Sequence, residues 1–141
     1  MTMRTRALLT SLCAAAVLVA ASCDDDEDTN PTPASPLVGT WNATSWTNTT
    51  GDQIANGMGF NAVLSQNGTV TLNMTGDLTG LCNPGPNCTR TGTWTSNGST
   101  LTISSDPDVL SLNWSMNNDQ NQMTWTGNLG GEATTIVFNK Q

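Results

Sequence analysis

The sequence predicts an all-β domain, a small eight-stranded antiparallel up-and-down barrel over residues 37–141, with a β-sandwich of the same strands as the alternative. Three observations predict it. Apolar and polar residues alternate in several short runs, tight-turn sequences separate these runs, and no helical period is present after residue 22. Closing the meander into a barrel would remove the exposed edge strands that promote aggregation, which favours the barrel over the sandwich.

The first strands are marked by alternation and by an Asn-Gly pair. An opening strand is expected over 38–47, and alternating apolar residues define two more over 58–64 and 70–74. Asn67-Gly68 lies between the last two, and both residue types tolerate the positive φ of a type I′ hairpin turn. We therefore expect these two strands to pair as an antiparallel hairpin.

The second half of the chain repeats this plan. Alternating apolar residues define five further strands, around Trp94 and over 101–103, 110–116, 123–125 and 136–138. The segments between them are rich in Asn, Asp, Ser, Gly and Pro, and they lie at 96–99, 106–108, 117–120 and 130–131. Short segments of this composition form tight turns, so consecutive strands are expected to be neighbours.

The same alternation predicts the core. Its expected members are Trp41, Met58, Phe60, Leu64, Val70, Leu72, Met74, Trp94, Leu101, Ile103, Leu110, Leu112, Trp114, Met116, Met123, Trp125, Ile136 and Phe138. An eight-stranded barrel is either filled by such side chains or holds one small ligand. The sequence leaves both possibilities open.

Tryptophan and methionine are the candidate ligand-binding residues, because Met adapts to irregular shapes and Trp offers a flat apolar face with one donor. The candidates are Trp41, Trp94, Trp114, Trp125, Met74 and Met116, and the alternative is that they only fill the core. Trp46 lies an odd number of positions from Trp41 and is expected to face outward on a regular strand. There it would anchor a partner, stack on a sugar or occupy a surface depression.

Residues 1–22 have the features of a lipoprotein signal peptide. Arg4 and Arg6 precede an apolar stretch over 7–21 that is too short to span a bilayer comfortably. The following Ala21-Ser22-Cys23 resembles a bacterial lipobox, in which the cysteine is acylated, for example with palmitate, and becomes the first mature residue. Ordinary signal cleavage is the alternative. The expected location is the cell envelope, with a lipid anchor in the outer membrane and the domain either periplasmic or surface-exposed.

Residues 23–36 are expected to form a tether that begins at the lipidated cysteine. Five consecutive acidic residues follow Cys23, and three prolines follow these. Like charges extend a chain and prolines stiffen it, which indicates a solvated spacer. The acidic run also resembles surface-export signals of Bacteroidetes-type lipoproteins, and in other bacteria an Asp at this position indicates retention in the inner membrane.

The cysteines indicate a disulfide. Cys23, Cys82 and Cys88 remain after the signal, and lipidation of Cys23 leaves one pair. Cys82 and Cys88 enclose five residues in a loop between two strands, and a disulfide is the default in an exported protein. A metal site is the rival, but it would need further ligands and the chain has no His.

Composition excludes several functions. The formal net charge of −7 becomes about −9 without Arg4 and Arg6, and such a chain repels nucleic acid. No enzyme activity and no cofactor are expected. The chain has no His to act as a general base, no free thiol once the cysteines pair, and carboxylates that fall mostly at predicted turns.

Four segments resemble the lipocalin-like domain found in many bacterial lipoproteins. They are Leu37–Trp41, Gly92–Thr95, Ser99–Ile103 and Thr135–Lys140. Gly39-x-Trp41 also matches the G-x-W signature that opens the first strand of true lipocalins. The resemblance implies a barrel that binds a small apolar ligand, with Trp41 plugging its closed end and Lys140 packing on this Trp.

Two functions are therefore expected in order of preference. The first is a cell-envelope lipoprotein whose barrel binds a small apolar or amphipathic ligand. The alternative is an interaction or inhibitor module with a filled barrel that contacts an envelope protein through its surface or through the Cys82–Cys88 loop. Avidin-like biotin binding is a weaker candidate, because the chain has no Tyr and matches that class poorly beyond the first strand.

Overall fold

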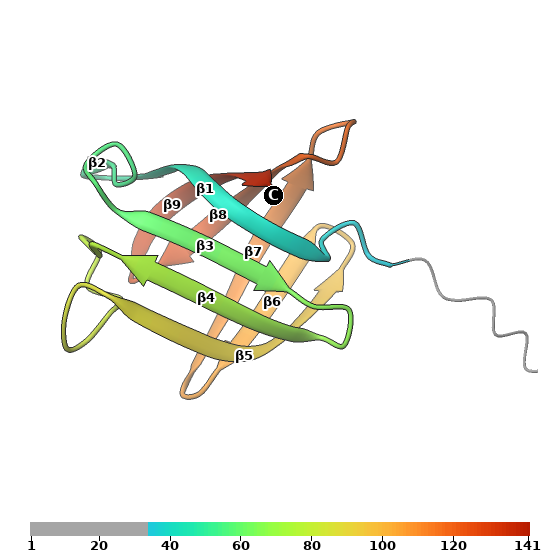
Figure 1. Ribbon diagram of the computed structural model, residues 1–141, viewed down its shortest axis with the longest axis horizontal. Helices are drawn as coiled ribbons and strands as arrows, with labels where there is room; N and C mark the ends of the chain where they lie inside the picture. The colour runs from blue at the N-terminus through green and yellow to red at the C-terminus, as the bar shows by residue number, and fades with distance from the viewer. Residues whose placement is uncertain (1–33) are drawn as a thin grey trace, which may run out of the picture. The chain divides into compact units, whose positions relative to one another are not determined.

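The computed structural model describes residues 34–141 as a closed eight-stranded antiparallel barrel with one short extra strand (Figure 1). The strands are β1 (Gly39–Asn48), β2 (Gly51–Asp52), β3 (Gly59–Leu64), β4 (Thr69–Thr75), β5 (Cys88–Asn97), β6 (Thr100–Ser105), β7 (Asp108–Met116), β8 (Gln122–Leu129) and β9 (Glu132–Lys140). Consecutive long strands are neighbours, and pairing of β1 with β9 closes the barrel. The predicted barrel is confirmed, and the sandwich is not formed. The signal peptide, Cys23 and most of the tether lie outside the described residues.

The strands and the core of the barrel are formed by residues 34–141. Each of the eight long strands pairs with a neighbour on both sides, so no long strand has a free edge. The core consists of side chains from this part of the chain, and residues 33–141 form one compact unit. A chain that begins at Asp24 is therefore expected to fold.

The hairpin between β3 and β4 is present, but its turn differs from the predicted type I′. Leu64 pairs with Val70, and a three-residue loop, 66–68, joins the strands. The backbone N–H of Ser65 donates to the carbonyl oxygen of Thr69, and the N–H of Gly68 donates to the carbonyl oxygen of Ser65. Gly68 has φ 81°, whereas Gln120 is the sole non-glycine residue with positive φ in residues 34–141. A type I′ turn needs positive φ at both central residues, so the type I′ prediction is wrong. The Asn67 side chain instead accepts the backbone N–H of Thr69.

A bulge in β1 turns Trp46 into the barrel. Ala43 pairs with Phe138 and Ser45 pairs with Val137, so Thr44 is an extra residue without a partner opposite. The bulge shifts the alternation by one position, and Trp46 is only 2% exposed. The expectation that Trp46 faces outward is therefore wrong, because it assumed a regular strand.

One end of the barrel is closed around Trp41. This side chain is fully buried, its Nε1 donates to the carbonyl oxygen of Leu37 at 2.8 Å, and the Nζ atom of Lys140 lies 5.2 Å from its ring centroid. The contact between Trp41 and Lys140 that the family resemblance implied is present. Gly39 lies next to the Lys140 side chain and has no room for a larger residue, since a Cβ there would lie 2.8 Å from Cε of Lys140.

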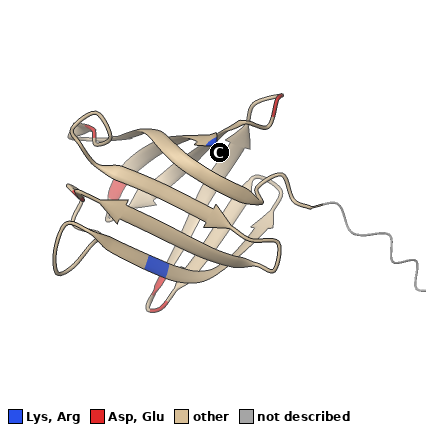
Figure 2. Ribbon diagram, in the orientation of Figure 1, with Lys and Arg blue, Asp and Glu red and all other residues tan. Residues whose placement is uncertain are grey.

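The predicted core is largely confirmed. Fifteen of its eighteen members are buried, and the other three are half-buried residues of β7: Leu110, Trp114 and Met116. The main additions are Leu37, Trp46 and Leu129. The outer face is polar but carries few charges, and Arg90 and Lys140 are the two basic residues within 34–141 (Figure 2).

Candidate functional site

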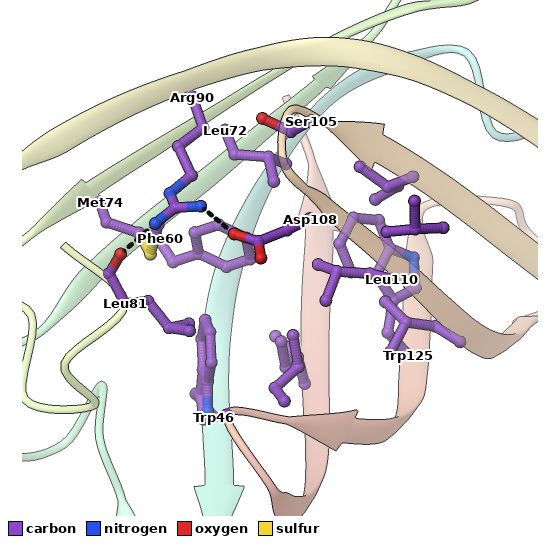
Figure 3. Close-up of a pocket in the computed structure, with 16 residues that line it drawn as sticks. Trp46, Phe60, Leu72, Met74, Leu81, Arg90, Ser105, Asp108, Leu110 and Trp125 are labelled. Atoms are coloured by element: carbon purple, nitrogen blue, oxygen red, sulfur yellow. Dashed lines mark hydrogen bonds and ion pairs between the residues drawn. The ribbon is translucent and has the colours of Figure 1, made fainter. Parts of the chain in front are cut away.

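A cavity of about 200 Å³ lies inside the barrel (Figure 3). Its buried wall is apolar and includes Trp46, Phe60, Leu72, Ile103, Trp125 and Ile136. These residues come from strands all around the barrel, so the cavity lies within the core. Val109, which is 67% exposed, also lines the cavity, which shows that one side reaches solvent.

Aromatic rings in this wall pack against one another. Trp46 packs edge-on against Phe60 with ring centroids 5.0 Å apart, and Phe60 in turn contacts Trp125 at 6.4 Å. Edge-to-face pairs of this kind are favourable beyond the area they bury. The Asp52 carboxylate accepts the backbone N–H of Trp46, and this hydrogen bond lowers the pKa of Asp52 below its ordinary value. The β1–β2 turn thereby helps to fix Trp46 in place.

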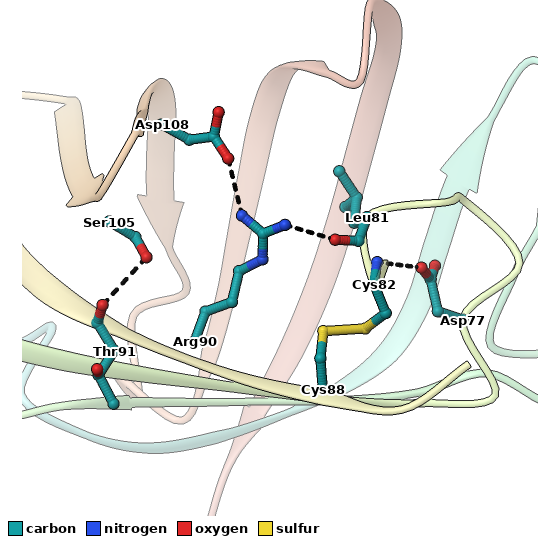
Figure 4. A network of polar contacts seen from close by, with 8 residues as sticks. All are labelled: Asp77, Leu81, Cys82, Cys88, Arg90, Thr91, Ser105 and Asp108. Atoms are coloured by element: carbon teal, nitrogen blue, oxygen red, sulfur yellow. Dashed lines mark hydrogen bonds and ion pairs between the residues drawn. A yellow bond between two sulfur atoms is a disulfide. The ribbon is translucent and has the colours of Figure 1, made fainter. Parts of the chain in front are cut away.

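The mouth of the cavity carries a charged pair. Arg90 of β5 donates from Nη1 to Oδ2 of Asp108 at 2.8 Å and from Nη2 to the carbonyl oxygen of Leu81 at 2.6 Å (Figures 3 and 4). All three residues line the cavity. Leu81 belongs to the β4–β5 loop and Asp108 begins β7, so Arg90 joins three separate segments at the opening.

The β4–β5 loop is held by a disulfide and by one carboxylate. Cys82 and Cys88 are bonded, as predicted, with their Cα atoms 5.5 Å apart. Burial alone would raise the pKa of Asp77, but hydrogen bonds from the backbone N–H of Cys82 and from Thr79 lower it below its ordinary value (Figure 4). The Asp77 carboxylate therefore stays charged and fixes the loop that places Leu81 beside Arg90.

Reduction of the disulfide is expected to lower the free energy of unfolding by about 2 kcal/mol, because the bond closes a short loop of about seven residues. Urea unfolding of the chain from Asp24, with and without dithiothreitol and followed by circular dichroism, measures this difference. The Cys82→Ser/Cys88→Ser variant is the control, and dithiothreitol should leave it unchanged. An identical unfolding midpoint in the oxidised and reduced wild-type proteins would contradict the expectation.

The six candidate ligand-binding residues separate into two groups. Met74 and Trp125 line the cavity, whereas Trp41, Trp94, Trp114 and Met116 do not. Along β7 the inward side chains of Leu110 and Leu112 reach the cavity, and Trp114 and Met116 lie farther along the same strand. Trp94 and Trp41 are fixed by hydrogen bonds from Nε1 to the carbonyl oxygens of Ser65 and Leu37. Trp41 and Trp94 therefore belong to the packed core, and the half-buried Trp114 and Met116 pack against it. None of the four lines the cavity.

Sequence reasoning missed two residues of the site, Trp46 and Arg90. Nothing in the local sequence marks the bulge that turns Trp46 inward. Arg90 could have been found, because it lies at even spacing from Cys88, Gly92 and Trp94 and therefore shares their inward face on β5. A charged residue on an inward face is uncommon and marks a position of interest.

Clusters of metal-binding side chains and membrane-spanning helices are both absent from residues 34–141. No group of three or more His, Cys, Asp or Glu side chains is placed there to hold a metal ion. Residues 34–141 also contain no helix long and apolar enough to cross a membrane.

In comparisons with protein-family models, curated proteins and solved structures, the chain matches none. The cavity and its mouth are therefore the basis on which function is inferred.

Proposed function

We propose that this protein is a bacterial cell-envelope lipoprotein of lipocalin-like type whose barrel binds a small apolar or amphipathic molecule, without catalysis and without a cofactor. The observation that carries the proposal is the cavity of about 200 Å³ with its apolar wall. Concave, mostly apolar cavities with a few polar groups are where small ligands bind. The pairing of Lys140 with Trp41 at the closed end supports the family resemblance.

The cavity volume limits the size of the ligand. An apolar cavity of about 150 Å³ takes up benzene, and one water occupies about 30 Å³ of the liquid. A volume of about 200 Å³ thus corresponds to roughly seven groups the size of a methylene. The buried part of the ligand is therefore a single ring or about seven carbons of an aliphatic chain. An eight-carbon amphiphile would fill the cavity with its first carbon at the mouth.

Calorimetric titration with a series of 1-alkanols tests this proposal on the oxidised chain from Asp24. Each buried methylene contributes about 0.8 kcal/mol, so affinity should rise about fourfold per carbon. The rise should end near about eight carbons, when the cavity is full. Absence of binding by every alkanol would contradict the proposal.

Two matched variants of β7 locate the binding. Leu110→Phe narrows the cavity and should weaken 1-octanol at least about tenfold, since about two methylenes would lose their space. Met116→Phe places the same ring on the same face of the strand but outside the cavity wall and should leave affinity unchanged. Equal effects of the two variants would show that the alkanol binds elsewhere.

The number of cysteines supports the proposed lipid anchor. Cys82 and Cys88 are bonded to each other, so Cys23 is the cysteine without a partner after the signal peptide. Acylation of Cys23 would use that thiol and attach the acidic tether, and with it the barrel, to the outer membrane.

A second candidate function is a protein-interaction or inhibitor module of the envelope. Leu78 and Val109 favour it, because they are large apolar side chains with exposed fractions of 57% and 67%. Trp46, which sequence analysis offered as an outer anchor, is buried and does not contribute. Failure of every alkanol to bind would make this the preferred function.

A further inference from the structure

The mouth of the cavity carries a charged side chain, Arg90, in addition to the apolar wall. We infer that the ligand is an anionic amphiphile, a monocarboxylate with a short aliphatic or aromatic tail, and that Arg90 binds its head group. This inference rests on the proposed function, because it assumes that the cavity takes up the tail. It is carried by the position of Arg90 and by the hydrogen-bond donors of Arg90 that have no protein partner among the described residues.

Arg90 lies where a head group would emerge from the cavity. Its side chain follows the inward face of β5 and is 34% exposed, while the apolar wall lies deeper in the barrel. A tail packed against Phe60 and Leu72 would place the polar end of the molecule at the guanidinium (Figure 3). The tail is then buried and the charge remains near solvent, which avoids the large cost of burying a charge.

The guanidinium has capacity for another acceptor. It carries five N–H donors, and within residues 34–141 only two hydrogen bonds use them, one to Asp108 and one to Leu81. Three N–H groups therefore have no protein partner in this region. A planar guanidinium matches a carboxylate, which it binds through two parallel hydrogen bonds.

The ion pair between Asp108 and Arg90 is weak, so a ligand carboxylate can compete with Asp108 for the guanidinium. Asp108 contacts Arg90 through a single oxygen, and its side chain is 57% exposed. Exposed pairs of this kind contribute little to stability, so a ligand carboxylate can displace Asp108 toward solvent. The bond to the Leu81 carbonyl would keep the guanidinium in place during the exchange.

Arg90 also selects between head groups. A guanidinium only donates hydrogen bonds, so it favours ligands with acceptor oxygens over ligands that only donate, such as amines.

Three probes with the same tail test the inference: octanoate, 1-octanol and octylamine, titrated by calorimetry at pH 7 into the chain from Asp24. Octanoate should bind at least about tenfold more tightly than 1-octanol, since hydrogen bonds to charged groups are the stronger kind. Octylamine should bind most weakly, because its charge is repelled by Arg90.

Three variants assign the preference to Arg90. Arg90→Gln should abolish the preference for octanoate over 1-octanol, because the charged carboxylate loses more affinity than the uncharged hydroxyl group. Asp108→Asn should tighten octanoate several-fold, because the competing carboxylate is gone, and it alters an exposed residue that the fold does not depend on. Lys140→Gln alters the other basic residue of the barrel and should change neither the affinity for octanoate nor the affinity for 1-octanol.

The outcomes separate this inference from the proposed function. Equal affinities for octanoate and 1-octanol, or a preference that survives Arg90→Gln, would overturn the carboxylate inference and leave the apolar site standing. Absence of binding by all three probes would overturn both. Should Arg90→Gln fail to fold, unchanged octanoate affinity in Asp108→Asn would still contradict the inference.

Discussion

Replacing Trp46 by alanine is expected to lower the free energy of unfolding by about 3–5 kcal/mol, the usual cost of truncating a buried tryptophan. The side chain is 2% exposed and packs edge-on against Phe60 at 5.0 Å, so its removal joins a new void to the existing cavity. Its Nε1 atom has no partner among the described residues, so the loss comes from packing and not from a hydrogen bond.

Urea unfolding of Trp46→Ala, followed by circular dichroism, measures this loss. Trp46→Phe is the matched control, because it keeps a ring against Phe60 and should cost much less. Leu78→Ala, at a residue that is 57% exposed, should change stability by less than about 0.5 kcal/mol. A Trp46→Ala protein as stable as Leu78→Ala would mean that Trp46 faces solvent and that the bulge at Thr44 is absent.

Replacing Cys23 by alanine is expected to abolish lipid labelling of the full chain completely. In a Gram-negative host fed with an alkyne analogue of palmitate, the wild-type chain should carry the label and be found with the membranes. An acyl group can attach only through a nucleophilic side chain or a new amino terminus, and both depend on Cys23 in a lipoprotein. The variant should keep its signal peptide and migrate as a larger, unlabelled chain.

Cys13→Ala is the control for this experiment, since Cys13 lies within the proposed signal peptide and would be lost with it. That variant should be processed and labelled like the wild type. Absence of label on the wild-type chain, or processing of the Cys23→Ala protein to the mature size, would indicate an ordinary secreted protein instead of a lipoprotein. Label on the Cys23→Ala protein would indicate acylation at another residue.

Much of the fold could be predicted because strands, turns and core depend on local patterns. The alternation at 58–64 and 70–74 reports directly which side chains face inward, and the buried residues of β3 and β4 follow it. The Cys82–Cys88 disulfide could be predicted from the cysteine count, because acylation of Cys23 would leave one pair after residue 22. The pattern failed at Trp46, because a bulge inserts one residue and reverses every later position of the strand.

The candidate site was less accessible from sequence. Alternation indicates whether a side chain faces inward, but not how far along the barrel it lies. Trp114 and Leu112 both face inward on β7, yet only Leu112 reaches the cavity. Which end stays open depends on packing between strands distant in sequence, such as Phe60 of β3 against Trp125 of β8. The partners of Arg90, in a loop and at a strand start, are likewise set by tertiary structure.

The most direct test of the central claim, that a small apolar molecule binds inside the barrel, is nuclear Overhauser contact between 1-octanol and methyl-labelled protein. The terminal methyl group of the alcohol should show contacts with the methyl groups of Ile103, Leu112 and Ile136, which line the buried wall. Contacts confined to the exposed methyl groups of Leu78 and Val109, or no contacts at saturating 1-octanol, would contradict the claim.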